Sequence, residues 1–284
     1  MALSRIHYLH PVKNVNTTAT KPSIKELGFD LLTLSRYQLF MTIATPFAFF
    51  VLYYFFAFND LWPAAVFCTM ALSFTSYGST SHDLVHENLK IHKTLNDVLL
   101  AALELICFRS GHAYKLSHLY HHKRYPNKDD VEGAAARMSF FRSLIEGVIF
   151  QPKIYYWGLI NYKHHKYYRL IVFEGAMIIM LMLFCVYSIS FTYVFVIYMC
   201  LMIAGSWIIP VVTSYVVHSP EGEHELIQTR LFRGSFFSIV AFNHLFHLEH
   251  HLYPMVPHMN WPKLAQRLDR YFQSEGIRPV KVNV

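Results

Sequence analysis

Three long stretches without a charged side chain limit what this chain can fold into. They are the 23 residues at 37–59, the 22 residues at 61–82 and the 46 residues at 175–220. About 20 apolar residues make a helix long enough to cross the hydrocarbon core of a bilayer. The third stretch has room for two crossings, joined near residues 188–192. The sequence therefore predicts an all-α integral membrane protein with four transmembrane helices.

Composition and charge support this prediction. Hydrophobic residues make up 54% of the chain and charged residues 15%, which is too little polar material to cover a soluble globular domain. With four crossings, all 25 Lys and Arg residues fall on one side, in residues 1–36, 82–169 and 221–284. The positive-inside rule assigns this side, with both termini, to the cytoplasm. The net charge of +7 then needs no nucleic-acid partner.

The segments between the predicted spans complete the expected topology. Residues 1–36 lack the apolar core and cleavage site of a signal peptide, so we expect them to stay on the protein. Residues 94–108 and 139–160 are apolar but short or interrupted. We expect helices there that lie in the membrane interface or pack under a cytoplasmic helical cap.

Histidine is the second unusual feature, because the 18 histidines equal all Asp and Glu residues together. Eight of them fall into three short clusters, with histidines three or four positions apart. On a helix, this spacing places side chains on one face, so each cluster is expected to converge on a point. The clusters are His82 and His86; His118, His121 and His122; and His247, His250 and His251.

Converging imidazoles indicate a metal site. Neutral imidazole binds zinc, copper, iron and nickel, and eight such ligands are too many for one tetrahedral zinc ion but suit two metal ions with open positions. The four cysteines lie singly in apolar stretches, so no thiolate site or disulfide framework is expected. In the predicted topology, all three clusters reach the cytoplasmic side together.

Residues near the clusters are candidates for ligand or supporting roles. His218, at the end of the fourth predicted span, is a ninth candidate ligand, or a buried histidine with another partner. Four polar residues near the clusters are candidates to hydrogen-bond the free ring nitrogens: Asp83, Glu87, Asn243 and Glu249. The alternative is that they are solvated surface groups. His112 and His244 are intermediate and could also hydrogen-bond these nitrogens. The remaining histidines are expected at the surface: His7, His10, His92, His164, His165, His224 and His258.

The clusters and their flanking residues resemble the three histidine boxes of the membrane fatty acid desaturase superfamily, which also includes carotenoid hydroxylases and ketolases. The matching segments are H-D-x-x-H at 82–86, SHLYHHKRYPNKDDVEG at 117–133 and HLEHHLYPMVPHMNWPKL at 247–264. Two independent H-x-x-H-H boxes are a specific signal. One departure is Leu245, because the family often has Asn or Asp two residues before the third box.

The resemblance implies a desaturase-like domain at residues 37–270, between a cytoplasmic segment at 1–36 and a tail at 271–284. It implies two iron ions held by the eight box histidines, which use O₂ to introduce a double bond into the alkyl chain of an acyl lipid or acyl-CoA. The chain would enter from the bilayer between the spans. Candidate wall residues, which are otherwise ordinary lipid-facing side chains, are Met177, Met180 and Phe184.

O₂ chemistry of this kind needs electrons from outside the chain. The sequence has no nucleotide-binding glycine motif, cysteine cluster or fused haem domain that we can identify. An external electron-donor protein of the ferredoxin or cytochrome type is therefore expected.

Two kinds of alternative remain open at this point. Within the superfamily, a carotenoid hydroxylase or ketolase, or a fatty acid hydroxylase, has similar boxes. In a different class, the histidines could bind haem or metal in a membrane electron carrier or transporter. Haem ligands come one per helix within the spans, which the spacing of the three boxes does not match. Transport would need polar groups lining the membrane interior, where the sequence offers only Glu174, just before the stretch at 175–220, as an ionisable side chain ahead of His218.

Overall fold

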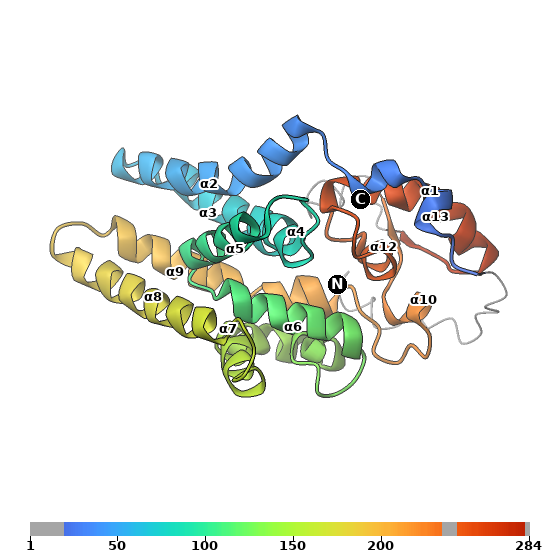
Figure 1. Cartoon of the computed structure of the whole chain (residues 1–284). Helices are drawn as coiled ribbons and strands as arrows, with labels where there is room; N and C mark the ends of the chain where they lie inside the picture. Colours follow the sequence, from blue (N-terminus) through green and yellow to red (C-terminus); the bar gives the residue numbers. More distant parts are fainter. Residues whose placement is uncertain (1–19, 235–242, 282–284) are drawn as a thin grey trace.

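The computed structural model describes residues 20–234 and 243–281, and most of this part of the chain is helical (Figure 1). The long helix α2 (Arg36–Phe58) and α3 (Trp62–Thr75) lie side by side as an antiparallel pair. Ser35 caps α2 through a capping box with Gln38, and Pro63 stands in the first turn of α3. The short turn between the two helices contains Asp60 at φ 58°.

Three helical stretches in the described residues are long and apolar enough to cross a membrane. They are Phe29–Phe58, Tyr168–Ser190 and Val194–Tyr215. The last two contain α8 (Tyr168–Tyr187) and α9 (Val194–Ser206), which form a second antiparallel pair. Two crossings joined near residues 188–192 were expected here, and the structure turns at Ser188–Ser190.

The second expected span, residues 61–82, differs from a single regular helix. Helix α3 has 14 residues, which gives a length of about 21 Å. A wider π-type turn at Ser76–Thr80 follows, and then α4 (Ser81–Val85), which carries the first histidine box. Ser and Thr hydroxyls bond back to the helix backbone here, for example Thr75 Oγ1 to the Ala71 carbonyl at 2.7 Å, and such bonds compete with regular helix geometry.

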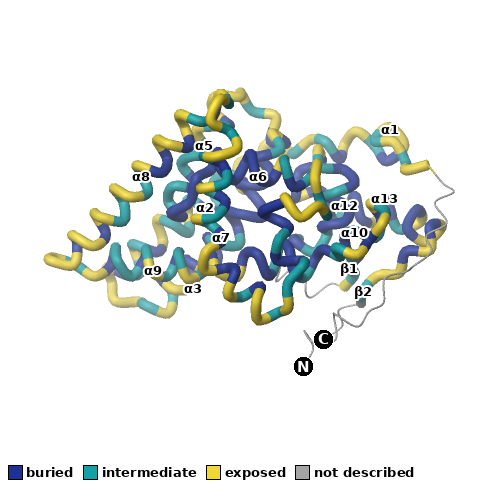
Figure 2. The backbone as a smooth tube through the Cα atoms, turned by 90° about the horizontal axis from the view of Figure 1, so that it is seen from below, coloured by how far each residue is buried: buried dark blue, intermediate teal, exposed yellow. Residues whose placement is uncertain are grey.

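Exposed apolar side chains cover the outer helices. Figure 2 shows exposed residues along α8 and buried residues concentrated around α6. On α8, Ile179 is 61% exposed and Leu183 is 64% exposed. An apolar helix with an exposed apolar face is suited to contact with lipid.

The rest of the chain packs around the end of these helices that carries α4. Helices α5 (Lys93–Ile106), α6 (Gly111–Arg124) and α7 (Phe140–Asn161) lie beside α8 and α9, and the short helix η4 (Glu132–Arg137) connects α6 to α7. Helices thus form at both segments, 94–108 and 139–160, where interfacial helices were expected.

The C-terminal part forms its own packed unit. It contains α10 (Glu225–Gln228), α12 (His247–Leu252), α13 (Trp261–Ser274) and the parallel strands β1 (Phe232–Arg233) and β2 (Val280–Lys281). The expected boundary at residue 270 therefore falls inside α13.

A segment near the N-terminus, residues 24–33, packs across this unit, and we call it the strap. It contains α1 (Ile24–Leu27), and its residues Leu27 and Leu31 belong to the same hydrophobic cluster as α12 and α13. The side chain of Asn260 donates to the carbonyls of Leu31 and Thr33 at 2.9 and 3.0 Å. Both ends of the described chain therefore support the helix that carries the third histidine box.

Candidate metal centre

Among the described residues, nine histidines from four separate segments gather into two clusters. Within each cluster, one ring nitrogen per residue lies within 4.8 Å of all the others. The first cluster is His82, His86, His118, His122 and His250; the second cluster is His121, His218, His247 and His251. These are the eight box histidines together with His218, the residues that the sequence singled out.

The helical register divides the second and third boxes between the two clusters. On α6, His118 and His122 are four residues apart and point to the first cluster, whereas His121 points to the second. On α12 the arrangement is reversed, because His247 and His251 contribute to the second cluster and His250 to the first. On a helix, residues i and i+4 point in nearly the same direction, and residue i+3 points to the other side of that direction. Each H-x-x-H-H box can therefore serve two sites.

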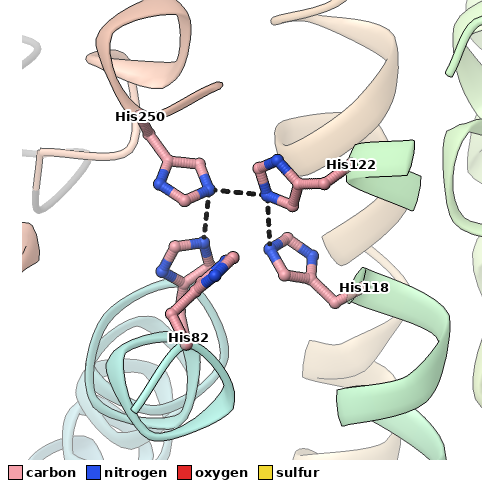
Figure 3. Close-up of side chains that lie close together, drawn as sticks. His82, His118, His122 and His250 are labelled. Carbon is pink, nitrogen blue, oxygen red and sulfur yellow. Dashed lines mark hydrogen bonds between the residues drawn. The ribbon is translucent and has the colours of Figure 1, made fainter. Parts of the chain in front are cut away.

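The first cluster brings the Nε2 atoms of its histidines together (Figure 3). His250 Nε2 lies 3.0 Å from His82 Nε2 and 2.8 Å from His122 Nε2. His122 Nε2 lies 3.1 Å from His118 Nε2. The fifth member, His86, packs against the same rings, with 4.8 to 5.0 Å between ring centres. Its Nε2 atom has no hydrogen-bond partner within the described parts of the chain.

The second cluster is built in the same way around His218, which follows the turn Val211–Tyr215. The Nε2 atom of His218 lies 3.0 Å from that of His121 and 3.2 Å from those of His247 and His251. His247 and His251 are 3.1 Å apart at the same atoms. His218 is fully buried.

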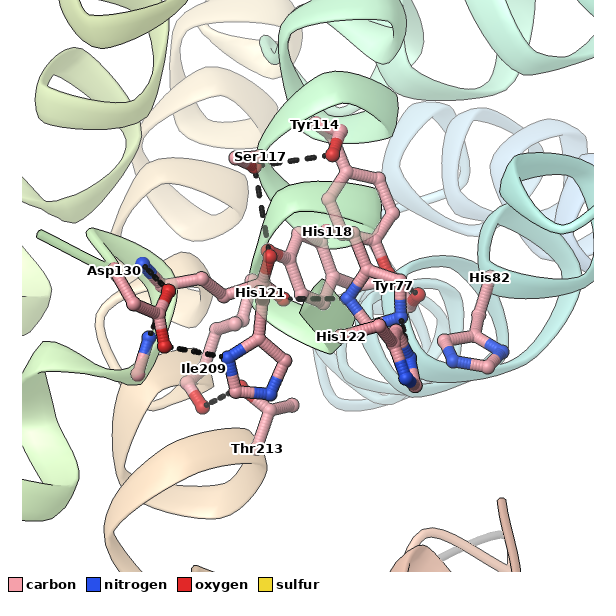
Figure 4. Close-up of polar contacts among 12 residues, drawn as sticks. Tyr77, His82, Tyr114, Ser117, His118, His121, His122, Asp130, Ile209 and Thr213 are labelled. Atoms are coloured by element: carbon pink, nitrogen blue, oxygen red, sulfur yellow. Dashed lines mark hydrogen bonds and ion pairs between the residues drawn. The ribbon is translucent and has the colours of Figure 1, made fainter. Parts of the chain in front are cut away.

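The other ring nitrogens of the second cluster show which atoms carry protons. Asp130 accepts a hydrogen bond from His121 Nδ1 at 2.7 Å (Figure 4). Burial alone would raise the pKa of Asp130, but its interactions with His121 and the backbone amide of Gly133 outweigh burial and lower it. The Ser214 carbonyl, which can only accept, lies 3.2 Å from His218 Nδ1. In a neutral imidazole, a proton at Nδ1 leaves a lone pair at Nε2.

The lone pair of His218 Nε2 therefore faces three other nitrogens. One lone pair accepts one well-aligned N–H, so hydrogen bonding among these rings does not satisfy all the contacts. A metal ion would satisfy all of these contacts. Two nitrogens bound to one metal ion at right angles, each about 2.1 Å from the metal, lie about 3.0 Å apart. The observed separations of 2.8 to 3.2 Å match this value, and the unpartnered Nε2 of His86 fits the same explanation. The residues present thus fit one metal ion in each cluster.

Burial keeps most of these rings neutral, as metal ligation requires. It lowers the pKa of His82, His86 and His250 well below the ordinary value, and neighbouring histidines lower the pKa further. His218 follows the same pattern. His121 is the exception, since the Asp130 carboxylate outweighs burial and raises its pKa.

A second acidic residue supports the first cluster. The Glu132 carboxyl lies 2.8 Å from His118 Nδ1 (Figure 4 shows the ring), and burial raises the pKa of Glu132 to about 8. Asp130 and Glu132 were missed as individual partners by sequence reasoning. A usable signal exists, because both belong to the acidic run that follows the second box.

The candidates expected to hold free ring nitrogens have other partners in the structure. Asp83 accepts hydrogen bonds from the backbone and the ring of His258 at 2.9 and 2.5 Å. Glu249 is paired with Arg233 at 2.6 Å. A residue next to a ligand in sequence points about 100° away from it around the helix, and in the described structure both carboxylates are bonded to other groups. His258 is 7% exposed, which corrects the expectation that it lies at the surface.

The remaining candidates also have defined positions. Glu87 is paired with Lys93 and Lys115, and Asn243 forms a tight turn at φ 66°. The ring of His112 is paired with Glu174 at 2.6 Å. His7 and His10 lie outside the described residues.

An apolar groove between α3 and α9 leads toward the histidines. Its volume is about 460 Å³. A small cavity of about 20 Å³ lies beside both clusters, and it shares four lining residues with the groove. The shared residues are Tyr77, Gly78, Thr213 and His244. The α8 residues Met177, Met180 and Phe184, which the sequence suggested as walls, are not among the groove residues.

Gly78 is essential to the shape at this junction. A methyl group placed on Gly78 would come within 1.7 Å of Cε1 in the His244 ring. The ring of His244 therefore fills the space that a larger residue at position 78 would need, and it lines both the groove and the small cavity beside the clusters.

Comparison with known proteins gives a family for this site. The sequence model described as fatty acid desaturase matches residues 60–281, which is most of the chain and includes all nine clustered histidines. No individual curated protein was found to match the chain. The family match, the apolar helices and the three boxes agree, and the chain belongs to the fatty acid desaturase family.

Proposed function

We propose that the chain is an O₂-dependent desaturase that holds two iron ions and introduces a double bond into the alkyl chain of an acyl lipid or acyl-CoA. The observation that supports this most directly is the convergence of Nε2 lone pairs in two adjacent clusters, at separations typical of neighbouring ligands on one metal ion. The family match supports the same type of chemistry.

In this proposal, one iron is held by the first cluster and the other by the second cluster. Imidazole suits iron as well as zinc or copper. Bound iron would supply the oxidising power needed to remove hydrogen from an unactivated carbon, which no side chain is basic enough to do alone.

The protein's own residues provide orientation and exclusion of water. Asp130 and the Ser214 carbonyl hold the protons of His121 and His218 at Nδ1, so that both Nε2 atoms stay available as ligands. Burial of the two clusters keeps solvent from the reacting atoms.

The groove between α3 and α9 is the proposed approach for the alkyl chain. It is lined by apolar residues of two membrane-type helices, so a chain can enter it sideways from lipid. His244, at the inner end of the groove, positions the reacting carbons beside the clusters.

We further propose four crossings, with α3 as the second, and both termini and the metal centre on the cytoplasmic side. The antiparallel pairing of α2 with α3 and the location of every Lys and Arg outside the three uncharged stretches support this topology. The four crossings lie within the proposed desaturase domain at 37–270. The electrons come from an external donor protein of the ferredoxin or cytochrome type.

Expression in a host with saturated and monounsaturated acyl lipids, together with a matched electron donor, tests the proposal. We expect new double bonds by gas chromatography, about two iron atoms per purified chain and no haem absorption band. His250→Ala should abolish the new products, and His224→Ala, at a position outside the clusters, should not. Hydroxylated fatty acids, or oxygenated carotenoids in a β-carotene-producing host, would replace the desaturase assignment by a hydroxylase or ketolase. A haem spectrum would overturn the metal assignment.

A further inference from the structure

A second cavity lies between α7, α8 and α9, on the other side of α9 from the groove. Its volume is about 320 Å³, which is in the range of small-molecule pockets. Most of its lining is apolar, including Ile178 and Met182 from α8 and Ile203 from α9. Two wall residues, Val148 and Ile179, are 48% and 61% exposed. The cavity is therefore next to the surface that lipid would cover.

Two buried hydrogen-bond donors without a partner in the described part of the chain interrupt the apolar lining. Arg109 and Gln151 both line the cavity. Nη1 of Arg109 and Nε2 of Gln151 are buried, and neither has a hydrogen-bond partner within residues 20–234 and 243–281. Arg109 is only 2% exposed. Buried donors without an acceptor are rare and unfavourable, so this pair points to a ligand that accepts hydrogen bonds.

The charge of Arg109 is already balanced. Its Nε and Nη2 atoms donate to the carboxylate of Glu104 at 2.7 and 3.1 Å, and Nη2 also donates to Ser76 Oγ at 2.9 Å. Glu104 is fully buried. A second anion beside this neutral pair would have to lose its hydration without a free positive charge in return. The remaining donors therefore suit an uncharged oxygen better than a carboxylate or a phosphate.

We propose that this cavity binds an uncharged, membrane-soluble molecule whose carbonyl oxygen accepts hydrogen bonds from Arg109 and Gln151. An acyl ester and a quinone both present such an oxygen on an apolar body. The site is separate from the histidine clusters, so the inference does not depend on the metal content or on the proposed reaction.

Tryptophan fluorescence gives a direct measurement, because Trp207 lines the cavity. Full-length protein in a maltoside detergent is titrated with a brominated fatty acid methyl ester, the ionised brominated acid, a brominated hydrocarbon of equal length and an alkyl benzoquinone. The ester or the quinone should bind about tenfold more tightly than the hydrocarbon. The acid should bind no more tightly than the ester. Comparison of the ester with the quinone identifies the preferred source of the carbonyl.

Variants separate this site from general partition into detergent. Gln151→Leu removes one donor at similar volume and should weaken carbonyl binding about fivefold to tenfold without changing hydrocarbon binding. Gln273→Leu, at an exposed position on α13, is the matched control and should leave both unchanged. Trp207→Phe should remove the signal. Equal binding of ester and hydrocarbon, or carbonyl binding unaffected by Gln151→Leu, would overturn the proposal.

Discussion

Replacing Asp130 by asparagine tests whether the proton position on His121 controls metal binding. Asp130 Oδ2 accepts from His121 Nδ1 at 2.7 Å, and Oδ1 accepts from the backbone amides of Glu132 and Gly133, each at 3.1 Å. If the new amide nitrogen faces His121, the ring must offer a lone pair at Nδ1, and its proton moves to Nε2, inside the second cluster. If the amide is turned round, its nitrogen faces two backbone donors and both of those bonds are lost.

The two arrangements cost similar amounts of free energy, the first in metal affinity and the second in folding stability. Loss of a partner that orients a metal-bound histidine typically lowers metal affinity by about 10- to 100-fold, or about 1.4 to 2.8 kcal/mol. Loss of two backbone hydrogen bonds costs about 1 to 3 kcal/mol of stability. We therefore expect Asp130→Asn either to bind iron at least about tenfold more weakly in chelator competition, or to unfold at lower temperature in the metal-free form.

The neighbouring Asp129 provides the matched control. Its carboxylate is about half exposed and accepts from Tyr120 and Arg124 at 2.6 and 3.0 Å. Asp129→Asn should leave iron affinity unchanged. If Asp130→Asn keeps both the iron affinity and the metal-free unfolding temperature of the unaltered protein, the argument from the tautomer of His121 is wrong.

Three further predictions concern the second cluster, the C-terminal unit and the groove. His218→Ala removes the nitrogen that contacts all other members of the second cluster and should reduce iron from about two atoms per chain to about one by elemental analysis. Arg233→Met leaves the Glu249 carboxylate buried without its partner and should lower the free energy of unfolding by about 3 kcal/mol in denaturant titration. Gly78→Ala displaces the ring beside it and should lower product formation roughly tenfold or more at unchanged iron content.

Each of these predictions has its own control. His224→Ala should retain the full iron content, and an unchanged content in His218→Ala would exclude that residue as a ligand. Adding Glu249→Gln to Arg233→Met should restore most of the lost stability; no recovery would mean that the ion pair is not the cause. Gly205→Ala, where a methyl group would lie 3.1 Å from Ser73 Oγ and 3.9 Å from Ser73 Cβ, should affect turnover less than Gly78→Ala. If Gly205→Ala lowered turnover more than Gly78→Ala, the proposed role of His244 in positioning the alkyl chain would be wrong.

Helical spacing predicted that the histidines within each box lie close together. The sequence did not show that the second and third boxes are each divided between the two clusters, so the expectation that each box converges on one point was wrong. The sequence also could not predict which histidine joins which cluster, because that depends on how α6 and α12 face each other. The acidic run after the second box is visible in the sequence, but which of its carboxylates meets which histidine is not, since Asp130 and Glu132 follow α6 in a loop and short helix whose path is set by packing. Counting uncharged residues located α8 and α9, but it did not show that Ser76–Thr80 interrupts the helix after α3. Exposure of His258 was predicted wrongly because its burial depends on Asp83, 175 positions away in the sequence.

The division of the third box between both clusters has a consequence for biosynthesis. A chain that stops before residue 247 contains four of the five nitrogens of the first cluster but only two of the four of the second. The two missing from the second cluster lie on α12, which is held in place by α13 and by the strap at residues 24–33. On the proposed assignment, the second iron can be captured only after α12 and α13 have been made and the strap at residues 24–33 has packed against α13. Unfinished or clipped chains would then be unable to assemble a paired-metal oxidant in the membrane.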